Sequence, residues 1–349
     1  MDKFVQEKII NSIKEQIEQD PANLHNYFRL ANTYAMFKDY DNALKEYLGL
    51  FEKNPENTII INSIGSIYFY KRQFDKAENF FEKAIELKPE DFSGYMNLAN
   101  IHAELQDYPK ALDNYDKAIK LSPDNASLYN AKANLQQEIG EIKDSIKTYK
   151  KAIDIAPDNF LTMVNLASAY FAANEFEKSL EYYQKGAQIN PKDCRTYACI
   201  ANTYTIMGKK ELAFEYYQKA IDVDPEYYDA YLCYAMSTND SEKAKEIFKR
   251  AIDIQPLNPK GYIALGNLYF DDKDFNKALE TYKKSTEIDP KYIVGFLSIA
   301  NTYVILNDIA SALDNYKKAY DLNSDDIELM LLYNDALDEF LRRKNKETK

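Results

Sequence analysis

The sequence predicts an all-α fold built from one pair of helices that is repeated about nine times. The word LANTY at residues 30–34 returns as IANTY at 200–204 and again at 299–303. Small residues and prolines recur with a step of 34 residues, apart from a single step of 31. Only 9 glycines and 11 prolines occur in 349 residues, which favours long helices over many tight turns. Self-similarity at a period of this size indicates a repeat architecture over nearly the whole chain.

Two series of residues define the phase of the repeat. The small-residue series is Ala43, Ala77, Ala111, Ser145, Ser179, Ala213, Ala244, Ala278 and Ala312. The proline series is Pro55, Pro89, Pro123, Pro157, Pro191, Pro225, Pro256 and Pro290, with Ser324 in the last position. Because both series keep the phase of the repeated word, we expect each period to be one structural unit.

The pattern predicts two amphipathic helices in each period. In the unit that begins at Phe92, the residues Tyr95, Leu98, Ala99 and His102 follow the i, i+3, i+4, i+7 spacing of one helix face. A second helix carries alanine, an aromatic residue and alanine on one face, and the proline after it ends the helix.

Polar residues that follow the prolines are suited to cap the next first helix. They are Asn57, Asp91, Asn125, Asn159, Asp193 and Asn258, with Asn23 and Asp326 at the two ends of the array. Tyr227 and Tyr292 depart from this rule, which leaves those two helix starts open.

The two ends of the chain differ from the repeats between them. Residues 2–19 predict a lone second helix over the first repeat, with apolar residues Phe4, Ile9, Ile10, Ile13 and Ile17. Residues 327–343 predict a solvating cap helix, with Met330, Leu331, Tyr333, Leu337 and Phe340 among acidic residues. Terminal units with a polar outer face are typical of repeat arrays.

This pattern resembles the tetratricopeptide repeat. That repeat has a large residue, Leu-Ala or Leu-Gly and Tyr in its first helix, then Ala, Tyr or Phe, Ala and Pro in its second. The large first residue is Tyr27, Ile61, Tyr95, Tyr129, Met163, Tyr197, Tyr231, Tyr262 and Phe296. The aromatic residue of the second helix is Tyr47, Phe81, Tyr115, Tyr149, Tyr183, Tyr217, Phe248, Tyr282 and Tyr316. These columns also account for the excess of tyrosine, which numbers 30.

The resemblance implies a right-handed α-solenoid of about nine helix-turn-helix repeats with a capping helix at each end. We expect an N-terminal cap over 1–23 and a C-terminal cap helix with a basic tail over 327–349. The nine repeats are expected at 24–57, 58–91, 92–125, 126–159, 160–193, 194–227, 228–258, 259–292 and 293–326. We expect no linker and no second domain.

The asparagine of the repeated word is the candidate binding residue. In the resembled fold the first helices line the concave face of the superhelix, where this position is exposed. The equivalent residues are Asn32, Ser66, Asn100, Asn134, Ser168, Asn202, Met236, Asn267 and Asn301, and other inward positions add Asn62, Asn97, Asn130 and Asn165. A side-chain amide both donates and accepts hydrogen bonds, so a ladder of amides suits the backbone of an extended segment. A purely structural role for these asparagines, between or within helices, remains the alternative.

Two groups of proteins within the resembled family indicate which kind of partner to expect. Adaptors that hold acidic C-terminal tails of heat-shock chaperones use Lys and Arg beside Asn on adjacent first helices. At the corresponding positions this chain has Phe28 with Asn32, Asn62 with Ser66, and Met96 with Asn100. None of these residues is Lys or Arg, and an acidic chaperone tail is therefore not expected as the ligand. The array is similar instead to the superhelix of O-GlcNAc transferases, whose concave asparagines hold extended protein substrates. We expect no catalytic domain beside the array in this sequence.

The remaining features favour a non-catalytic cytoplasmic protein. The net charge of −12 disfavours nucleic acid and anionic membranes. Cys194, Cys199 and Cys233 lack ligand-like spacing and are interpreted as free thiols, and His102 is interpreted as a core residue. No metal, cofactor or signal peptide is expected.

The function predicted from these residues is a scaffold or adaptor that holds an extended partner segment. Two alternatives remain. One is a structural subunit that docks through its convex face or its ends, and the other is a regulatory subunit of an enzyme. Self-association is left open.

Two repeats depart from the pattern. The seventh has lost three residues between Ala235 and Ala244, which predicts an early end of its first helix, a cap by Ser241 and a local change of pitch. The fourth places Lys132 and Gln136 where Leu and Tyr are expected, so its first helix is predicted to bury less apolar surface and to exchange its amide hydrogens faster.

Overall fold

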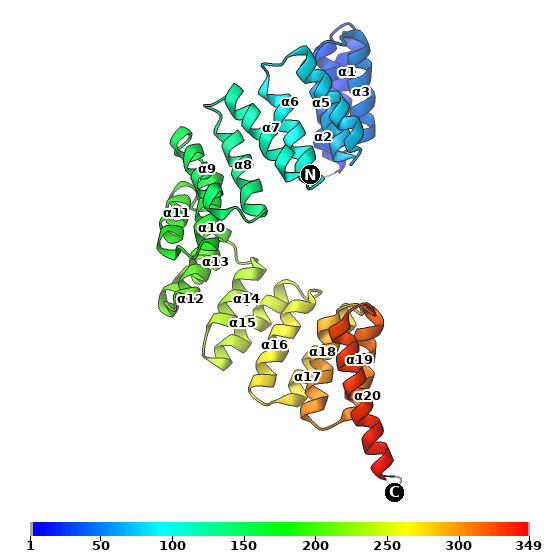
Figure 1. Ribbon diagram of the computed structural model, residues 1–349, viewed down its shortest axis with the longest axis vertical. Helices are drawn as coiled ribbons and strands as arrows, with labels where there is room; N and C mark the ends of the chain where they lie inside the picture. The colour runs from blue at the N-terminus through cyan, green and yellow to red at the C-terminus, as the bar shows by residue number, and fades with distance from the viewer. Residues whose placement is uncertain (1–2, 348–349) are drawn as a thin grey trace. The chain divides into compact units, whose positions relative to one another are not determined.

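The computed structural model describes residues 3–347, and within them the chain forms twenty α-helices (Figure 1). Residues 1–2 of the expected N-terminal cap and residues 348–349 of the expected C-terminal segment lie outside the described residues. The helices are α1 (Lys3–Gln19), α2 (Leu24–Met36), α3 (Tyr40–Lys53), α4 (Thr58–Tyr70), α5 (Phe74–Leu87), α6 (Phe92–Glu104), α7 (Tyr108–Leu121), α8 (Ala126–Glu138), α9 (Ile142–Ile155), α10 (Phe160–Ala172), α11 (Phe176–Ile189), α12 (Cys194–Ile206), α13 (Lys210–Val223), α14 (Tyr228–Ser237), α15 (Ser241–Ile254), α16 (Pro259–Asp271), α17 (Phe275–Ile288), α18 (Ile293–Ile305), α19 (Ile309–Leu322) and α20 (Ile327–Glu347). The expected all-α array of helix pairs is confirmed.

The predicted caps of the first helices are confirmed. In each case the side-chain oxygen accepts from a backbone N–H of the first turn, which satisfies a donor that has no partner within the helix. The capping residues are Asn23, Asn57, Asp91, Asn125, Asn159, Asp193, Asn258 and Asp326. Tyr227 and Tyr292 precede α14 and α18 without a side-chain cap, and these helices nevertheless begin at the expected place.

The turn inside each repeat closes on a residue in the left-handed conformation. Eight repeats place one residue at the same position with φ between 56° and 85°, and only two of the eight are glycine. These residues are Lys38, Arg72, Gln106, Gly140, Asn174, Gly208, Lys273 and Asn307. Next to Gln106, the N–H of Asp107 bonds to the carbonyl of His102, five residues back, which is the Schellman closure of a helix end.

The seventh repeat lacks this turn because of its deletion. Its first helix, α14, ends at Ser237, and Thr238 is extended. The predicted cap by Ser241 is wrong. Asp240, in extended conformation, accepts from the N–H of Lys243 and caps α15, whereas Ser241 is already the first helical residue. The Ser241 hydroxyl donates instead to Asp272, at 2.5 Å.

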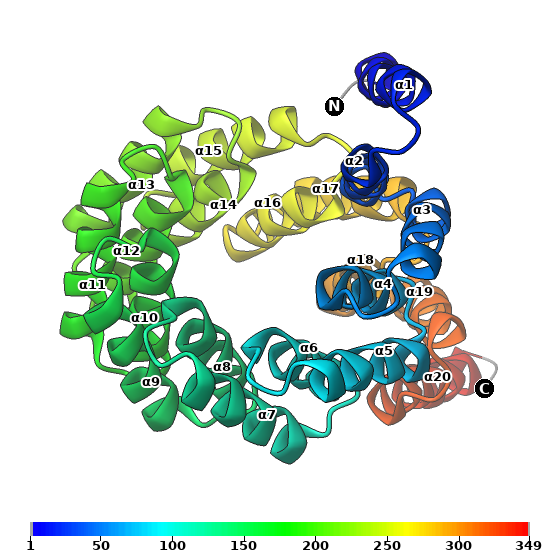
Figure 2. The ribbon, with the colours of Figure 1, turned by 90° about the horizontal axis from the view of Figure 1, so that it is seen from above.

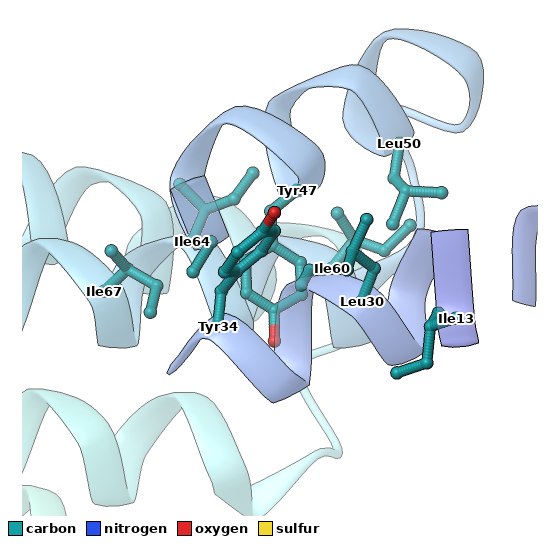
Figure 3. Packing of buried hydrophobic residues seen from close by; sticks show 10 residues of the cluster. Ile13, Leu30, Tyr34, Tyr47, Leu50, Ile60, Ile64 and Ile67 are labelled. Carbon is teal, nitrogen blue, oxygen red and sulfur yellow. The ribbon is translucent and has the colours of Figure 1, made fainter. Parts of the chain in front are cut away.

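The core runs along the contacts between helices. At the small-residue positions Ala31, Ala43 and Ala77 are fully buried, because a neighbouring helix passes directly over them. Figure 3 shows how Leu30 and Tyr47 pack among apolar residues at the first end of the array. Ile13 of α1 belongs to this cluster, so α1 covers the first repeat as expected.

The fourth repeat buries polar groups in place of apolar ones. In α8 the buried apolar residues are Leu128, Ala133 and Leu135, a set as large as Leu30, Ala31 and Tyr34 in α2. The buried apolar residues therefore do not set this repeat apart, and its faster amide exchange stays a prediction. Gln136 is buried and accepts from the hydroxyl of Thr148, at 2.7 Å. Lys132 pairs with Asp116 of the preceding repeat, also at 2.5 Å.

The contacts divide the chain after Glu175 into two compact units, α1–α10 and α11–α20. Within the first unit α4 contacts α6 and α8 contacts α10, and within the second α14 contacts both α12 and α16, while α16 also contacts α18. Among the described residues, no two second helices contact each other as extensively as these first helices do. We call the side on which first helices approach one another the inner face of each unit. Figure 2 shows α8 and α10 on this side and α7 and α9 on the other. No helix among the described residues has the length and apolarity needed to span a bilayer.

Candidate functional site

The inner face is formed by four positions of each repeat, which lie on the first helix except for Asn239 in the seventh repeat. In α2 they hold Phe28, Arg29, Asn32 and Ala35, and the equivalent residues follow at steps of 34, or 31 across the seventh repeat. Almost all of these side chains are half-buried or exposed. We call these positions the inner stripe.

The inner stripe is almost without charge. Although 29% of the chain is charged, Arg29 is the single charged residue at these positions in the nine repeats. Its guanidinium donates to the side chain of Gln16 on α1, at 2.8 Å. The stripe therefore offers amides, hydroxyls, thiols and apolar groups, and no ionic contact along most of its length.

The asparagines of the repeated word accept a hydrogen bond from tyrosine within their own repeat. The tyrosine lies 15 residues further on, on the second helix, and its hydroxyl donates to the asparagine Oδ1. The pairs are Asn32 with Tyr47, Asn100 with Tyr115, Asn134 with Tyr149, Asn202 with Tyr217, Asn267 with Tyr282 and Asn301 with Tyr316. In the last five pairs the oxygen atoms are 2.5–2.8 Å apart. The hydroxyl of a buried tyrosine thus obtains the partner that it requires.

Repeats without the tyrosine hydroxyl also lack the asparagine. The second repeat has Phe81 with Ser66, and the seventh has Phe248 with Met236. An asparagine is therefore found only where a tyrosine is present to bond with it. The signal is present in the sequence, but it becomes visible only when the first and second helices of a repeat are compared.

The bond to tyrosine uses only the carbonyl half of each amide. Within residues 3–347, no hydrogen bond engages the Nδ2 of Asn32, Asn100, Asn202, Asn267 or Asn301. The Nδ2 group carries two N–H donors. The bond to tyrosine orients the amide and leaves these donors unbonded on inner-stripe side chains that are half-buried or exposed. The structural interpretation and the binding interpretation of the asparagines are therefore compatible.

The other predicted asparagines are placed differently from one another. Asn165 donates to Oδ1 of Asn134 at 3.0 Å and of Asn130 at 3.5 Å, which joins the fourth repeat to the fifth. Asn97 is half-buried, and its side chain makes no hydrogen bond within the described part of the chain. Asn62 has a buried Oδ1 without a donor. The structure thus brings Asn130, Asn134 and Asn165 together, whereas Asn97 and Asn62 remain separate from that group.

A small pocket opens on the inner face between α4 and α6. It holds about 70 Å³ and is lined by Ser66, Phe69, Tyr70, Phe81, Asn97 and Asn100. The Ser66 hydroxyl is already bonded to the carbonyl of Asn62, at 2.9 Å. Phe81 is almost fully buried, whereas Tyr70 is 60% exposed.

Burial shifts the acidity of the paired tyrosines. It raises the pKa of Tyr115, Tyr217 and Tyr282 from 10.0 to about 12, and it also raises the pKa of Tyr47, Tyr149 and Tyr316. The cause is the loss of water around a phenolate. At neutral pH these hydroxyls are protonated and can donate to the asparagines.

The predicted histidine and cysteine assignments agree with the structure. His102 is buried, with its Nε2 4.0 Å from a carboxylate oxygen of Glu78. Cys194, Cys199 and Cys233 are free thiols, and burial raises the pKa of each of them. No group of three or more His, Cys, Asp or Glu residues within the described part of the chain is placed to hold a metal ion.

Comparison with known proteins identifies the repeat. Models of the tetratricopeptide repeat match residues 60–91, 92–125, 114–147, 160–193, 194–227, 225–256, 259–292 and 295–326. No curated protein matches the chain significantly.

Solved structures share the fold at low sequence identity. Yeast Tom70 is 14% identical, with a TM-score of 0.56 over 97% of this chain and 93% of that one. The C-terminal part of a TPR repeat-containing protein from Cytophaga hutchinsonii is 19% identical, with a TM-score of 0.55 over 68% of this chain and 99% of that one. A tetratricopeptide repeat protein from Parabacteroides merdae is 18% identical, with a TM-score of 0.54 over 70% of this chain and 98% of that one.

Proposed function

Because the chain belongs to the tetratricopeptide repeat family, we propose that it is a non-catalytic scaffold or adaptor that holds an extended segment of a partner protein along its inner face. The binding residues of this proposal are Asn32, Asn62, Asn97, Asn100, Asn130, Asn134, Asn165, Asn202, Asn267 and Asn301. The free thiols support a reducing compartment such as the cytoplasm. The scaffold requires no cofactor.

The observation that carries the proposal is the half-used amide of the inner stripe. Tyrosine orients each paired asparagine and leaves its two N–H donors unbonded, as at Asn100 and Asn202. An extended peptide presents a carbonyl on each residue, so regularly spaced amides can bind it with little demand on its side chains. Orientation before binding reduces the entropy that is lost when the partner binds.

The strength of such binding depends on several contacts at once. One hydrogen bond contributes about 0.5–1.5 kcal/mol net. A micromolar complex requires about 8 kcal/mol beyond the cost of association. We therefore expect the segment to contact several repeats, with apolar contacts between the hydrogen bonds.

The test uses a pair of double variants that both lose the two asparagine–tyrosine bonds. Asn100→Ala with Asn134→Ala removes these bonds, the acceptor of Asn165 and the free amide donors. Tyr115→Phe with Tyr149→Phe removes these bonds and the bond from Tyr149 to Gln137, and keeps the asparagine amides. Peptides are first selected on the full chain from a phage-displayed library of random short peptides, and their affinity for each variant is then measured by titration calorimetry.

The proposal predicts that the asparagine variant loses affinity by roughly tenfold or more, as expected for two lost hydrogen bonds, and that the tyrosine variant loses much less. Thermal unfolding shows whether both variants fold. Equal affinity of the two variants for the selected peptides would refute the proposal, and so would a failure to select any peptide on the wild-type chain.

A second candidate function is a structural subunit that docks through the opposite, outer face. The observation in its favour is a hollow of about 550 Å³ between α17, α18 and α19, lined by residues that include Lys283, Tyr303 and Lys318. In this case crosslinks to a partner would map to α17 and α19 and would be absent from the inner stripe.

A further inference from the structure

We infer that the pocket between α4 and α6 is an anchor site for one small apolar side chain of an uncharged extended peptide. The inference rests on the proposed function, because it names the chemistry of the segment that the inner face would hold. It goes further because it states which side chain of the segment enters the pocket, and this fixes the position of the segment along the inner face. The anchor has the size of alanine, valine or threonine.

The shape of the pocket sets the size of its occupant. The pocket is lined by the almost fully buried Phe81, by two aromatic residues, Phe69 and Tyr70, which we call its walls, and by three polar residues, Ser66, Asn97 and Asn100, which we call its rim. The volume is about 70 Å³. One water molecule occupies about 30 Å³ in the liquid. The pocket therefore admits a few methyl groups and excludes an aromatic ring or a long side chain.

The pocket exists because the second repeat lacks the asparagine–tyrosine pair. Ser66 is smaller than the asparagine at the equivalent position, and Phe81 has no hydroxyl to fill the space beside it. The eighth repeat provides the comparison within the same chain. Its Gly266 lies against Tyr282 just as Gly65 lies against Phe81, but there Asn267 occupies the space and accepts from the tyrosine.

The aromatic walls are held in place before any ligand arrives. The ring of Tyr70 stacks on that of Tyr40, with centroids 5.6 Å apart and planes at 7°. The ring of Phe69 meets Tyr70 and Phe74 edge to face, at 5.8 and 5.7 Å. Because these contacts fix Tyr70 although it is 60% exposed, the pocket does not need to form on binding.

The rim favours a peptide backbone on both sides of the anchor. Asn100 accepts from Tyr115 at 2.6 Å and keeps its Nδ2 donors, and the amide of Asn97 is unbonded within the described residues. Both amides can therefore bond to backbone groups next to the anchoring side chain. None of the residues that line the pocket is charged. Burying a charged side chain here would cost free energy without compensation, so the segment should be uncharged at and around the anchor.

The test rebuilds the missing pair and thereby fills the pocket. In the variant Ser66→Asn with Phe81→Tyr, the second repeat acquires the arrangement that Gly266, Asn267 and Tyr282 already have in the eighth. The variant is therefore expected to fold as well as the wild type, which thermal unfolding checks. The control is Asn315→Ser on the second helix α19, where the amide bonds to the carbonyl of Ser311 and lies outside the inner stripe.

Peptides selected from the phage-displayed library on the wild-type chain serve as the probe. We expect them to share one small apolar residue flanked by uncharged residues, and to bind the rebuilt variant roughly tenfold more weakly or worse. Replacing that residue by glycine should reduce affinity for the wild type by a similar factor and should have little effect with the rebuilt variant. The control variant should bind the peptides as the wild type does.

Two results would overturn the inference, and they differ from failure of the proposed function. One is unchanged affinity of the rebuilt variant for peptides that do require the amides of Asn100 and Asn134. The other is a selection dominated by charged or aromatic residues at the anchor. If instead the peptides bind without those amides, or if none is selected, the proposed function itself fails and the anchor site fails with it.

Discussion

At the scale of single residues, the asparagine of the repeated word has two halves with different tasks. Its carbonyl oxygen satisfies a tyrosine hydroxyl from the second helix of the same repeat, as in Asn100 with Tyr115. Its Nδ2 group remains available on the inner face. A buried hydroxyl without a partner is costly, which fits the phenylalanines at 81 and 248, in two repeats where the asparagine is missing.

Removing the asparagine of an asparagine–tyrosine pair should lower the free energy of unfolding more than removing the tyrosine hydroxyl. Tyr115→Phe leaves Asn100 half-buried, where water can replace the lost bond, and should lower the free energy of unfolding by about 1 kcal/mol. Asn100→Ala leaves the buried hydroxyl of Tyr115 unsatisfied and should cost about 1–3 kcal/mol. Denaturant unfolding of both single variants and the double variant measures the coupling. A double variant whose loss equals the sum of the single losses would show that the bond contributes nothing.

The paired tyrosines also predict how stability depends on pH. Their pKa in the folded chain, about 12 for Tyr115, Tyr217 and Tyr282, lies above the value of 10.0 expected in the unfolded chain. The folded state therefore favours the protonated form, and its stabilisation is complete below pH 10 and is lost as the pH rises toward 12. Unfolding by denaturant should require less denaturant in this alkaline range, with a parallel rise in tyrosinate absorbance. Tyrosinate that appears fully at pH 10 while the chain is still folded would contradict the burial.

At the scale of helices and turns, the left-handed residues between the two helices of eight repeats are under backbone strain where they are not glycine. Gln106 has a φ of 61°, a conformation that costs a residue with a side chain about 1–2 kcal/mol. Glycine adopts it freely but loses more entropy on folding. Gln106→Gly should therefore raise the free energy of unfolding by about 0.5–1 kcal/mol.

The reverse change at Gly140 is the control for this prediction. Gly140 has a φ of 85°, and a Cβ added there would meet nothing within 4 Å, so Gly140→Ala tests the backbone alone and should be destabilising. Denaturant unfolding measures both changes. If Gln106→Gly were destabilising as well, the turn would not be under strain.

The elements were more predictable from the sequence than the contacts between them. Proline after most second helices and Asn or Asp before most first helices act locally, so the pattern was sufficient to place the caps at Asn57 and Asp91. The left-handed turns gave no such signal, because six of the eight residues are not glycine and the Schellman closure stabilises whichever residue is present. At the seventh repeat, Asp240 and Ser241 are both good capping residues, and only the register of α15 decides between them.

At the scale of the whole molecule, almost all charged residues lie outside the inner stripe, which is the proposed binding surface. The chain carries a net charge of −12, yet the inner stripe has one charged residue, Arg29, at its first end. The sequence predicted that the asparagines lie on first helices, but the pocket beside Ser66 depends on side chains from three helices and could not be predicted from any one of them.

This separation predicts that binding of the selected peptides responds weakly to salt. Screening acts on pairs of charges, and an uncharged segment on an uncharged stripe has none. The dissociation constant should change by less than about threefold between roughly 0.05 and 0.5 M NaCl, as measured by calorimetry. A loss of affinity of a hundredfold or so over this range would mean that ionic contacts carry the complex.

The central claim is that the side-chain amides of the inner face hold a peptide backbone. The most direct measurement is an NMR titration of the full chain, labelled with ¹⁵N only in asparagine, with one selected peptide. The account predicts that the Nδ2 signals of Asn97, Asn100 and Asn134 shift on binding. Those of Asn114 and Asn315, whose amides bond to backbone carbonyls on second helices, should stay in place. Shifts confined to Asn114 and Asn315, with the inner amides unchanged, would contradict it.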